Sequence, residues 1–150
     1  ETTLFKYDTT GQHLQSIAKD RKIIGKVTLK FSVANKSGFV ALQLSNRKGE
    51  QYYVGYLPAS NQYFSSREAA GKKSFSEKFA PNKHYSPRFS NNKEIEMTVF
   101  FDNASAELFA DKGWTVMTDI FFPNEDFNQL DLKVVDVENF VLHECQVDWF

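Results

Sequence analysis

The sequence predicts an all-β protein whose short antiparallel strands form a two-sheet sandwich or a barrel. Apolar and polar residues alternate with a period of two in segment after segment, which is the periodicity of strands with one buried face. Turn residues, mainly Gly, Asn and Pro, separate these segments at regular intervals. Aromatic residues make up 15% of the 150 residues, mainly 15 Phe and 6 Tyr, and such side chains suit a half-buried pleated sheet.

The first half of the chain contains successive alternating segments, each closed by a turn. Residues 1–22 are expected to contain a first strand, around Thr3 to Tyr7, or the remnant of a linker. The residues expected on one face of the following strands are Val27, Leu29, Phe31, Val33, Val40, Leu42, Leu44, Tyr52, Val54, Tyr56, Tyr63 and Ser65. Asn, Gly, Pro and Ser concentrate at 35–38, 46–49 and 58–61, where we predict the turns.

The second half repeats this pattern around a polar hairpin connection at 102–105. The sequence there is Asp-Asn-Ala-Ser, and short Asx and Ser side chains favour turns because they bond to their own backbone. The expected same-face residues are Ile95, Met97, Val99, Phe101, Ala106, Leu108, Ala110, Leu130, Leu132 and Val134, with a last strand over 140–147. Within this set and the segment after the hairpin, we expect Val99, Phe101, Leu108 and Phe121 to be buried.

Evidence for helix is thin. Residues 12–22 have no convincing apolar stripe at helical spacing, and residues 66–70 could make one helical turn before Gly71. The longest irregular stretch runs from about 71 to 93 and is polar. A loop of this length is unusual in a compact domain and tends to be functional or mobile.

The composition excludes several classes of function. Charged residues make up 25% of the chain and the net charge is −1, so the clustered positive face that a nucleic-acid partner requires is missing. No apolar run approaches the length of a membrane span. Cys145 is the single cysteine, so it cannot close an internal disulfide and no zinc spacing exists.

A longer combination of motifs carries a family resemblance. The hairpin has the pattern Asp-x-x-Ser-x-Glu-x-Phe, and Thr-x-Ile-Phe-x-Pro follows after a turn. Residues 53–56 (Tyr-Val-Gly-Tyr), 63–67 (Tyr-Phe-Ser-Ser-Arg), 75–79 and the ending at Trp149 add to it. Together these resemble the C-terminal β-sandwich module of glycoside hydrolase family 32, which contains invertases, levanases and inulinases. The same module used alone to hold fructans is similar to family 66 carbohydrate-binding modules.

The resemblance covers the chain from about Ile23 to its end. It implies an antiparallel two-sheet sandwich of the concanavalin/lectin-like jelly-roll type over residues 23–150, with 1–22 as the N-terminal strand or linker remnant of a single domain. The chain begins at Glu1 without Met, so we expect a processed protein or a fragment of a larger enzyme. An exported bacterial protein, periplasmic, at the cell surface or secreted, is expected over a cytoplasmic one.

The resemblance also implies that the chain is not an enzyme by itself. In the family, the carboxylates that a glycosidase requires sit on a separate five-bladed propeller, in Asn-Asp-Pro-Asn-Gly, Arg-Asp-Pro and Glu-Cys motifs. The first two motifs are absent here, and we interpret Glu144-Cys145 as a chance match to the third. His13, His84 and His143 lie in unrelated contexts. We therefore expect no catalytic residue, no metal and no cofactor.

A sugar site is expected where the motifs place charge near strand ends. The candidate carbohydrate-binding residues are Arg67, Glu68, Asp102, Glu107 and Tyr63. Arginine offers a rigid fork of donors, and a carboxylate accepts hydrogen bonds from adjacent hydroxyl groups. Aromatic rings could supply stacking, and Tyr56 and Trp114 join Tyr63 as candidates for this. Asn103 and Ser66 stand where the family commonly has Arg and Asp, so this region carries less charge than the family pattern.

Structural interpretations of the same residues remain open. Arg67 and Glu107 could form a cross-strand pair worth less than about 1 kcal/mol if exposed. Asp102 could cap its turn, and the aromatic residues could belong to the core.

Three functions follow. The first is an accessory module of a fructan-acting hydrolase, packed on the catalytic propeller and able to hold fructan. The second is an independent carbohydrate-binding module for levan or inulin, and the third is a complete enzyme or a protein-interaction sandwich. A packing module should expose a broad apolar patch, whereas a binding module should show a small polar concavity with convergent charges.

Overall fold

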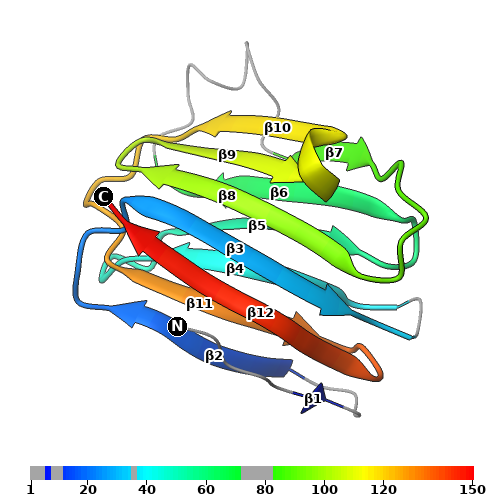
Figure 1. Ribbon diagram of the computed structural model, residues 1–150. Coiled ribbons are helices and arrows are strands. Elements are labelled where there is room, and N and C mark those ends of the chain that lie inside the picture. The colour runs from blue at the N-terminus through cyan, green and yellow to red at the C-terminus, as the bar shows by residue number, and fades with distance from the viewer. Residues whose placement is uncertain (1–5, 8–11, 35–36, 72–82) are drawn as a thin grey trace.

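The chain folds as a sandwich of two antiparallel β-sheets, which confirms the predicted fold class (Figure 1). The computed structural model describes residues 6–7, 12–34, 37–71 and 83–150. Sheet A, in spatial order, consists of β1 (Lys6–Tyr7), β12 (Phe140–Trp149), β3 (Gly25–Ser32), β8 (Ile95–Asp102), β9 (Ser105–Ala110) and β10 (Thr115–Ile120). Sheet B consists of β2 (Gln12–Lys19), β11 (Gln129–Val135), β4 (Phe39–Ser45), β5 (Gln51–Leu57), β6 (Gln62–Ala69) and β7 (Lys83–Pro87).

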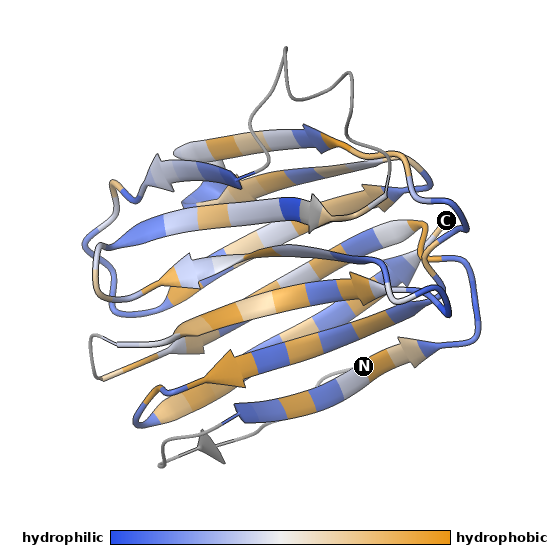
Figure 2. Ribbon diagram, turned by 180° about the vertical axis from the view of Figure 1, so that it is seen from behind, coloured by the Kyte–Doolittle hydropathy of each residue, from blue (hydrophilic) through white to orange (hydrophobic). Residues whose placement is uncertain are grey.

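The core lies between the sheets and is built by the alternation that the sequence predicts. Figure 2 shows apolar and polar residues following one another along the strands. Val99, Phe101, Leu108 and Phe121 are all buried, as expected. The inward positions of β5 are likewise buried, and the largest fully buried side chains include Tyr52, Tyr63, Phe31 and Phe140.

In three segments the structure adds to or differs from what the sequence predicts. Residues 66–69 extend β6 and form no helical turn. Within the stretch expected to be irregular, residues 83–87 form β7 and pair with β6, whereas residues 72–82 lie outside the described residues. Of residues 1–22, the segment Gln12–Lys19 forms β2 and pairs with β11. None of the described residues belongs to a helix long and apolar enough to cross a membrane.

Gly55 permits an aromatic contact across the outer face of sheet B. Phe39 on β4 and Phe64 on β6 are two strands apart, yet their ring centroids lie 5.7 Å from each other in an edge-to-face arrangement. Gly55 is on the strand between them, paired with Ala41 and Phe64. A Cβ atom at this position would lie 2.1 Å from the carbonyl oxygen of Val40, so only glycine fits.

Candidate functional site

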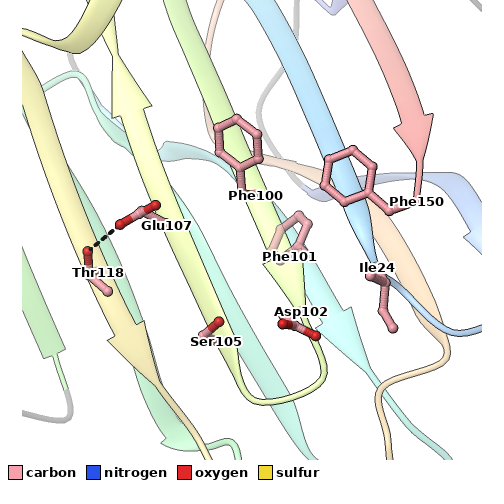
Figure 3. Close-up of a pocket in the computed structure, with 8 residues that line it drawn as sticks. All are labelled: Ile24, Phe100, Phe101, Asp102, Ser105, Glu107, Thr118 and Phe150. Carbon is pink, nitrogen blue, oxygen red and sulfur yellow. Dashed lines mark hydrogen bonds between the residues drawn. The ribbon is translucent and has the colours of Figure 1, made fainter.

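A hollow of about 260 Å³ opens on the outer face of sheet A, at the end where β8 turns into β9 (Figure 3). The residues that line it are Ile24, Phe100, Phe101, Asp102, Ser105, Glu107, Thr118 and Phe150. Two of the predicted sugar-binding residues, Asp102 and Glu107, therefore lie in one concavity. We call it the Phe100 hollow.

Strand register explains how these side chains come together. Phe100 is paired with Glu107, and Glu107 is paired with Thr118, so the three stand in one row across β8, β9 and β10. Alternation directs all three outward, because their neighbours along each strand are buried. The Thr118 hydroxyl donates a 3.3 Å hydrogen bond to Oε2 of Glu107, drawn as a dashed line in Figure 3.

An aromatic cluster forms one side of the Phe100 hollow. The Phe100 ring lies 5.7 Å from that of Phe109, nearly perpendicular to it, and 6.5 Å from that of Phe150, measured between centroids. Phe150 is 75% exposed. Asp102 at the polar side accepts a 2.7 Å hydrogen bond from the backbone N–H of Asn103, so it caps its turn and still borders the hollow. Apolar faces beside carboxylate oxygens can hold a hydroxylated ligand or a protein surface.

The structure does not bring Arg67 or Tyr63 to this hollow. Both point into the space between the sheets and are at most 5% exposed. The predicted grouping of Arg67 with Glu107 is not found, because β6 and β9 belong to different sheets. Glu68 lies on β6, and its side chain is outside the described residues.

Arg67 and Tyr63 instead belong to a polar seam along the side of the sandwich where β7 and β10 run side by side (Figure 1). The first half of the seam surrounds Asp119, which is 6% exposed. Its carboxylate accepts a 2.6 Å hydrogen bond from the Tyr52 hydroxyl and lies 3.6 Å from Nδ1 of His84. Burial and the neighbouring carboxylate raise the pKa of Tyr52 well above its ordinary value. Arg67 donates to the carbonyl oxygen of Ile120, next in the chain.

The second half of the seam surrounds Asp111. Its Oδ2 accepts a 2.6 Å hydrogen bond from the Tyr63 hydroxyl and a 3.1 Å bond from Nε of Arg88. Burial and this hydrogen bond raise the pKa of Tyr63, so it remains a donor. The guanidinium of Arg88 stays charged, because Asp111 raises its pKa against the opposing effect of burial. These contacts join the sheets, because Tyr63 is on sheet B and Asp111 follows β9 of sheet A.

The two remaining aromatic candidates, Tyr56 and Trp114, differ in exposure. Tyr56 is buried and donates to Oδ1 of Asn61 at 2.7 Å, whereas Trp114 is 66% exposed. Glu144, of the Glu-Cys dipeptide, lies on β12 and its Oε1 is 3.7 Å from Nζ of Lys30, its partner on β3. It therefore belongs to a cross-strand ion pair.

Sequence reasoning missed the aromatic part of the Phe100 hollow. Phe100 and Thr118 were available as outward positions in the alternation, but their role depends on which strands become neighbours. Phe150 and Ile24 reach the hollow because the backbone N–H of Phe150 bonds to the carbonyl of Ile24 at 3.0 Å. No local pattern predicts that contact between two residues so far apart in the chain.

Comparisons with known proteins show which family the chain is related to. The chain is 35% identical over 103 residues to an extracellular exo-inulinase of Aspergillus awamori, a match that covers 67% of this chain and 19% of that protein. It is 28% identical over 109 residues to a levanase of Bacillus subtilis, covering 69% and 16%. A crystal structure of the A. awamori exo-inulinase superposes with a TM-score of 0.78 at 26% identity, over 99% of this chain and 29% of that one.

The sequence matches thus cover less than a fifth of the length of these two relatives, and the superposition covers 29% of the exo-inulinase chain. The family model described as "Glycosyl hydrolases family 32 C terminal" matches residues 3–148. Because that match extends over almost the whole chain and agrees with the observed sandwich, the chain belongs to the family of C-terminal domains of family 32 glycosyl hydrolases.

Proposed function

We propose that this domain is a non-catalytic accessory module of an exported, fructan-acting hydrolase and that it packs on the catalytic propeller through the outer face of sheet A. Relatives named exo-inulinase and levanase support fructan as the substrate of the parent enzyme, and the word "extracellular" in one of those names supports export. The observation that carries the docking role is the apolar character of this sheet face.

The docking face consists of outward residues on β8, β9 and β10 with the C-terminal Phe150. Val116 and Ile120 on β10 are 49% and 53% exposed, and Phe100 and Phe109 stand on the two neighbouring strands. Val116 is the cross-strand partner of Phe109, whose ring contacts Phe100, and the Phe100 ring lies 6.5 Å from that of Phe150. Exposed apolar surface of this kind is typical of contacts with another protein surface. On the other half of the same sheet, cross-strand ion pairs such as Lys26 with Asp148, 3.6 Å apart, suit contact with water.

The test uses charge substitutions that an isolated domain tolerates. Ile120→Asp changes an exposed residue within the docking face, and Phe89→Asp changes a 58% exposed residue in the segment after β7, which is outside it. In the isolated chain both variants should unfold at the wild-type temperature. In the parent enzyme, Ile120→Asp should lower the melting temperature by several degrees and Phe89→Asp should not. Equal behaviour of the two variants in the parent enzyme would contradict the docking role.

The absence of activity is tested separately. The purified chain should release no reducing sugar from sucrose, levan or inulin. Release above that of a Glu144→Gln variant would overturn the non-catalytic assignment.

A second candidate function, which requires that the propeller leave the Phe100 hollow uncovered, is fructan binding, either within the parent enzyme or as an independent module. The Phe100 hollow supports it, because Asp102 and Glu107 can accept hydrogen bonds from hydroxyl groups beside the apolar Phe100 ring. Each such bond contributes only about 1 kcal/mol against water, so binding would be weak. In this proposal Arg67 and Tyr63 hold the fold and do not contact the sugar. Calorimetry with levan and inulin should show binding that Glu107→Ala abolishes, and binding unchanged in that variant would place the sugar elsewhere.

A further inference from the structure

A second hollow, of about 220 Å³, lies at the opposite end of strands β8 to β10. One wall comes from residues 90–94 and the start of β8, and the other comes from the turn at 111–114. We propose that this Trp114 hollow binds one sugar unit of a neutral oligosaccharide, with a face of the sugar stacked on the Trp114 indole. The inference is independent of the docking role and of sugar binding at the Phe100 hollow.

The exposure of Trp114 is the most direct evidence for a sugar site. Its side chain is 66% exposed although it is among the largest apolar side chains in the protein. Scattered exposed apolar residues are ordinary, but this indole forms part of the wall of a concavity whose other lining groups are hydrogen-bonding side chains. An apolar ring beside convergent polar groups matches the two kinds of surface that a sugar presents, its C–H face and its hydroxyl groups.

Arg88 fixes the two walls relative to each other. Its Nε donates to Oδ2 of Asp111 in the turn at 3.1 Å. Its Nη2 donates to the carbonyl oxygens of Asn92 and Glu94 in the opposite wall, at 2.6 and 3.2 Å. The Arg88 side chain is 6% exposed. One buried guanidinium therefore holds the hollow in shape before any ligand arrives, which reduces the entropic cost of binding.

The turn that presents Trp114 has an unusual backbone. Asp111, Lys112 and Gly113 all adopt positive φ values, of 51°, 62° and 92°. Non-glycine residues in this left-handed region carry strain and persist where the surroundings enforce them, which occurs preferentially at functional sites. In this turn, the hydrogen bond from the Tyr63 hydroxyl to the buried Asp111 carboxylate holds the backbone in its left-handed conformation.

The charges of the hollow favour a neutral, hydroxylated ligand. Among the described residues, neither Glu94 nor Glu96 has an ion-pair partner, whereas Glu144 on the same sheet is paired with Lys30. The two carboxylates can accept hydrogen bonds from a diol, and the Lys112 ammonium and Ser90 hydroxyl can donate. The two glutamates disfavour an anionic ligand. The Lys112 ammonium beside the single indole disfavours a cationic one.

Dimensions limit the ligand to a single sugar unit at this position. The volume lies below the several hundred Å³ typical of sites for larger ligands. On β8, Glu96 of the Trp114 hollow and Phe100 of the Phe100 hollow are four residues apart, about 13 Å at about 3.3 Å per residue.

The experiment titrates the full chain with an inulin-type and a levan-type trisaccharide, with maltotriose as a non-fructan arm, and follows tryptophan fluorescence and heat. Because Trp149 is the other tryptophan, the optical titration is done in a Trp149→Phe background. We expect a saturable change in Trp114 emission. Trp114→Ala should weaken binding at least tenfold, Trp114→Tyr should restore part of it, and Glu96→Gln should weaken it several-fold. Leu14→Ala, at a 51% exposed position on β2 of the other sheet, is the control and should bind like the wild type.

Unfolding midpoints check that the exposed substitutions leave the fold intact. Saturable binding of any of these sugars that requires Trp114 supports the site, and the preferred arm identifies the sugar class. The inference is overturned if no arm gives a saturable change up to the solubility limit. It is also overturned if Trp114→Ala binds within twofold of the wild type.

Discussion

Removing one hydroxyl group from Tyr52 should cost more stability than removing the same group from its neighbour Tyr53. Tyr52 points inward on β5, is 1% exposed and donates a 2.6 Å hydrogen bond to the buried Asp119 carboxylate. Tyr53 points outward, is half-buried and donates to the neutral amide oxygen of Gln51 at 2.7 Å. Tyrosine to phenylalanine removes the same atom at both positions, so the two variants are matched.

The magnitude follows from what each hydroxyl contacts. Hydrogen bonds to charged groups contribute about 1.5–3 kcal/mol, and neutral bonds contribute about 1 kcal/mol or less. In Tyr52→Phe the Asp119 carboxylate stays buried, with His84 3.6 Å away. The Phe ring retains the packing of Tyr52 on Phe121, whose centroid is 4.8 Å from it. We therefore expect losses of about 2 kcal/mol for Tyr52→Phe and below about 1 kcal/mol for Tyr53→Phe.

Urea unfolding measures the difference directly. With a slope of about 2 kcal/mol per molar urea, a loss of 2 kcal/mol lowers the unfolding midpoint by about 1 M. The slope itself should not change, because the variant exposes the same surface on unfolding. A Tyr52→Phe midpoint equal to or above that of Tyr53→Phe would refute the reasoning, because it would mean that the buried Asp119 does not depend on the hydroxyl.

Three further substitutions test other parts of the sandwich. Leu108→Ala should lose about 2–5 kcal/mol in denaturant unfolding, because the side chain is 1% exposed; a loss below about 0.5 kcal/mol would show that it is not part of a packed core. Gly55→Ala should lose about 1–3 kcal/mol, since its Cβ would collide with the Val40 carbonyl, and wild-type stability would contradict the close approach. Burial raises the pKa of Asp131, against hydrogen bonds from Gln129, so its contribution to stability is complete below the ordinary aspartate pKa and is lost as the pH rises through the raised value. Asp131→Asn should therefore gain stability relative to wild type between pH 4 and pH 7, and a constant difference would contradict the shift.

The sequence predicts the sandwich well because the alternation of apolar and polar residues that specifies it is a local pattern. Alternation assigns Val99, Phe101 and Leu108 to the core without knowledge of any partner strand, and the structure buries them. Pairing between sheets is not local, so the candidate site was only partly predictable. Asp102 and Glu107 come together because one hairpin connects them. Arg67 lies on the same side of β6 as Tyr63, so the alternation that buries Tyr63 also buries Arg67.

The exposure of Trp114 also could not be predicted from the local sequence. Its exposure depends on the three left-handed residues before it and on Arg88, which is 26 positions earlier in the chain. A turn composition at 111–113 predicts a change of direction, but not which way the next side chain points. Tertiary contacts decide that.

The polar seam also bears on how the protein behaves at high concentration. β7 and β10 are the outermost strands on that side of their sheets, and an outermost strand offers unpaired backbone groups on which a second molecule can grow a mixed sheet. Here Arg67 occupies the carbonyl of Ile120 at the end of β10, and the Thr115 hydroxyl donates to the carbonyl of Pro87 at the end of β7. Pro87 itself has no N–H to offer to a neighbour. The same contacts that hold the two sheets together thus leave fewer free positions for fibril-like growth, and variants that loosen the seam should precipitate before they unfold.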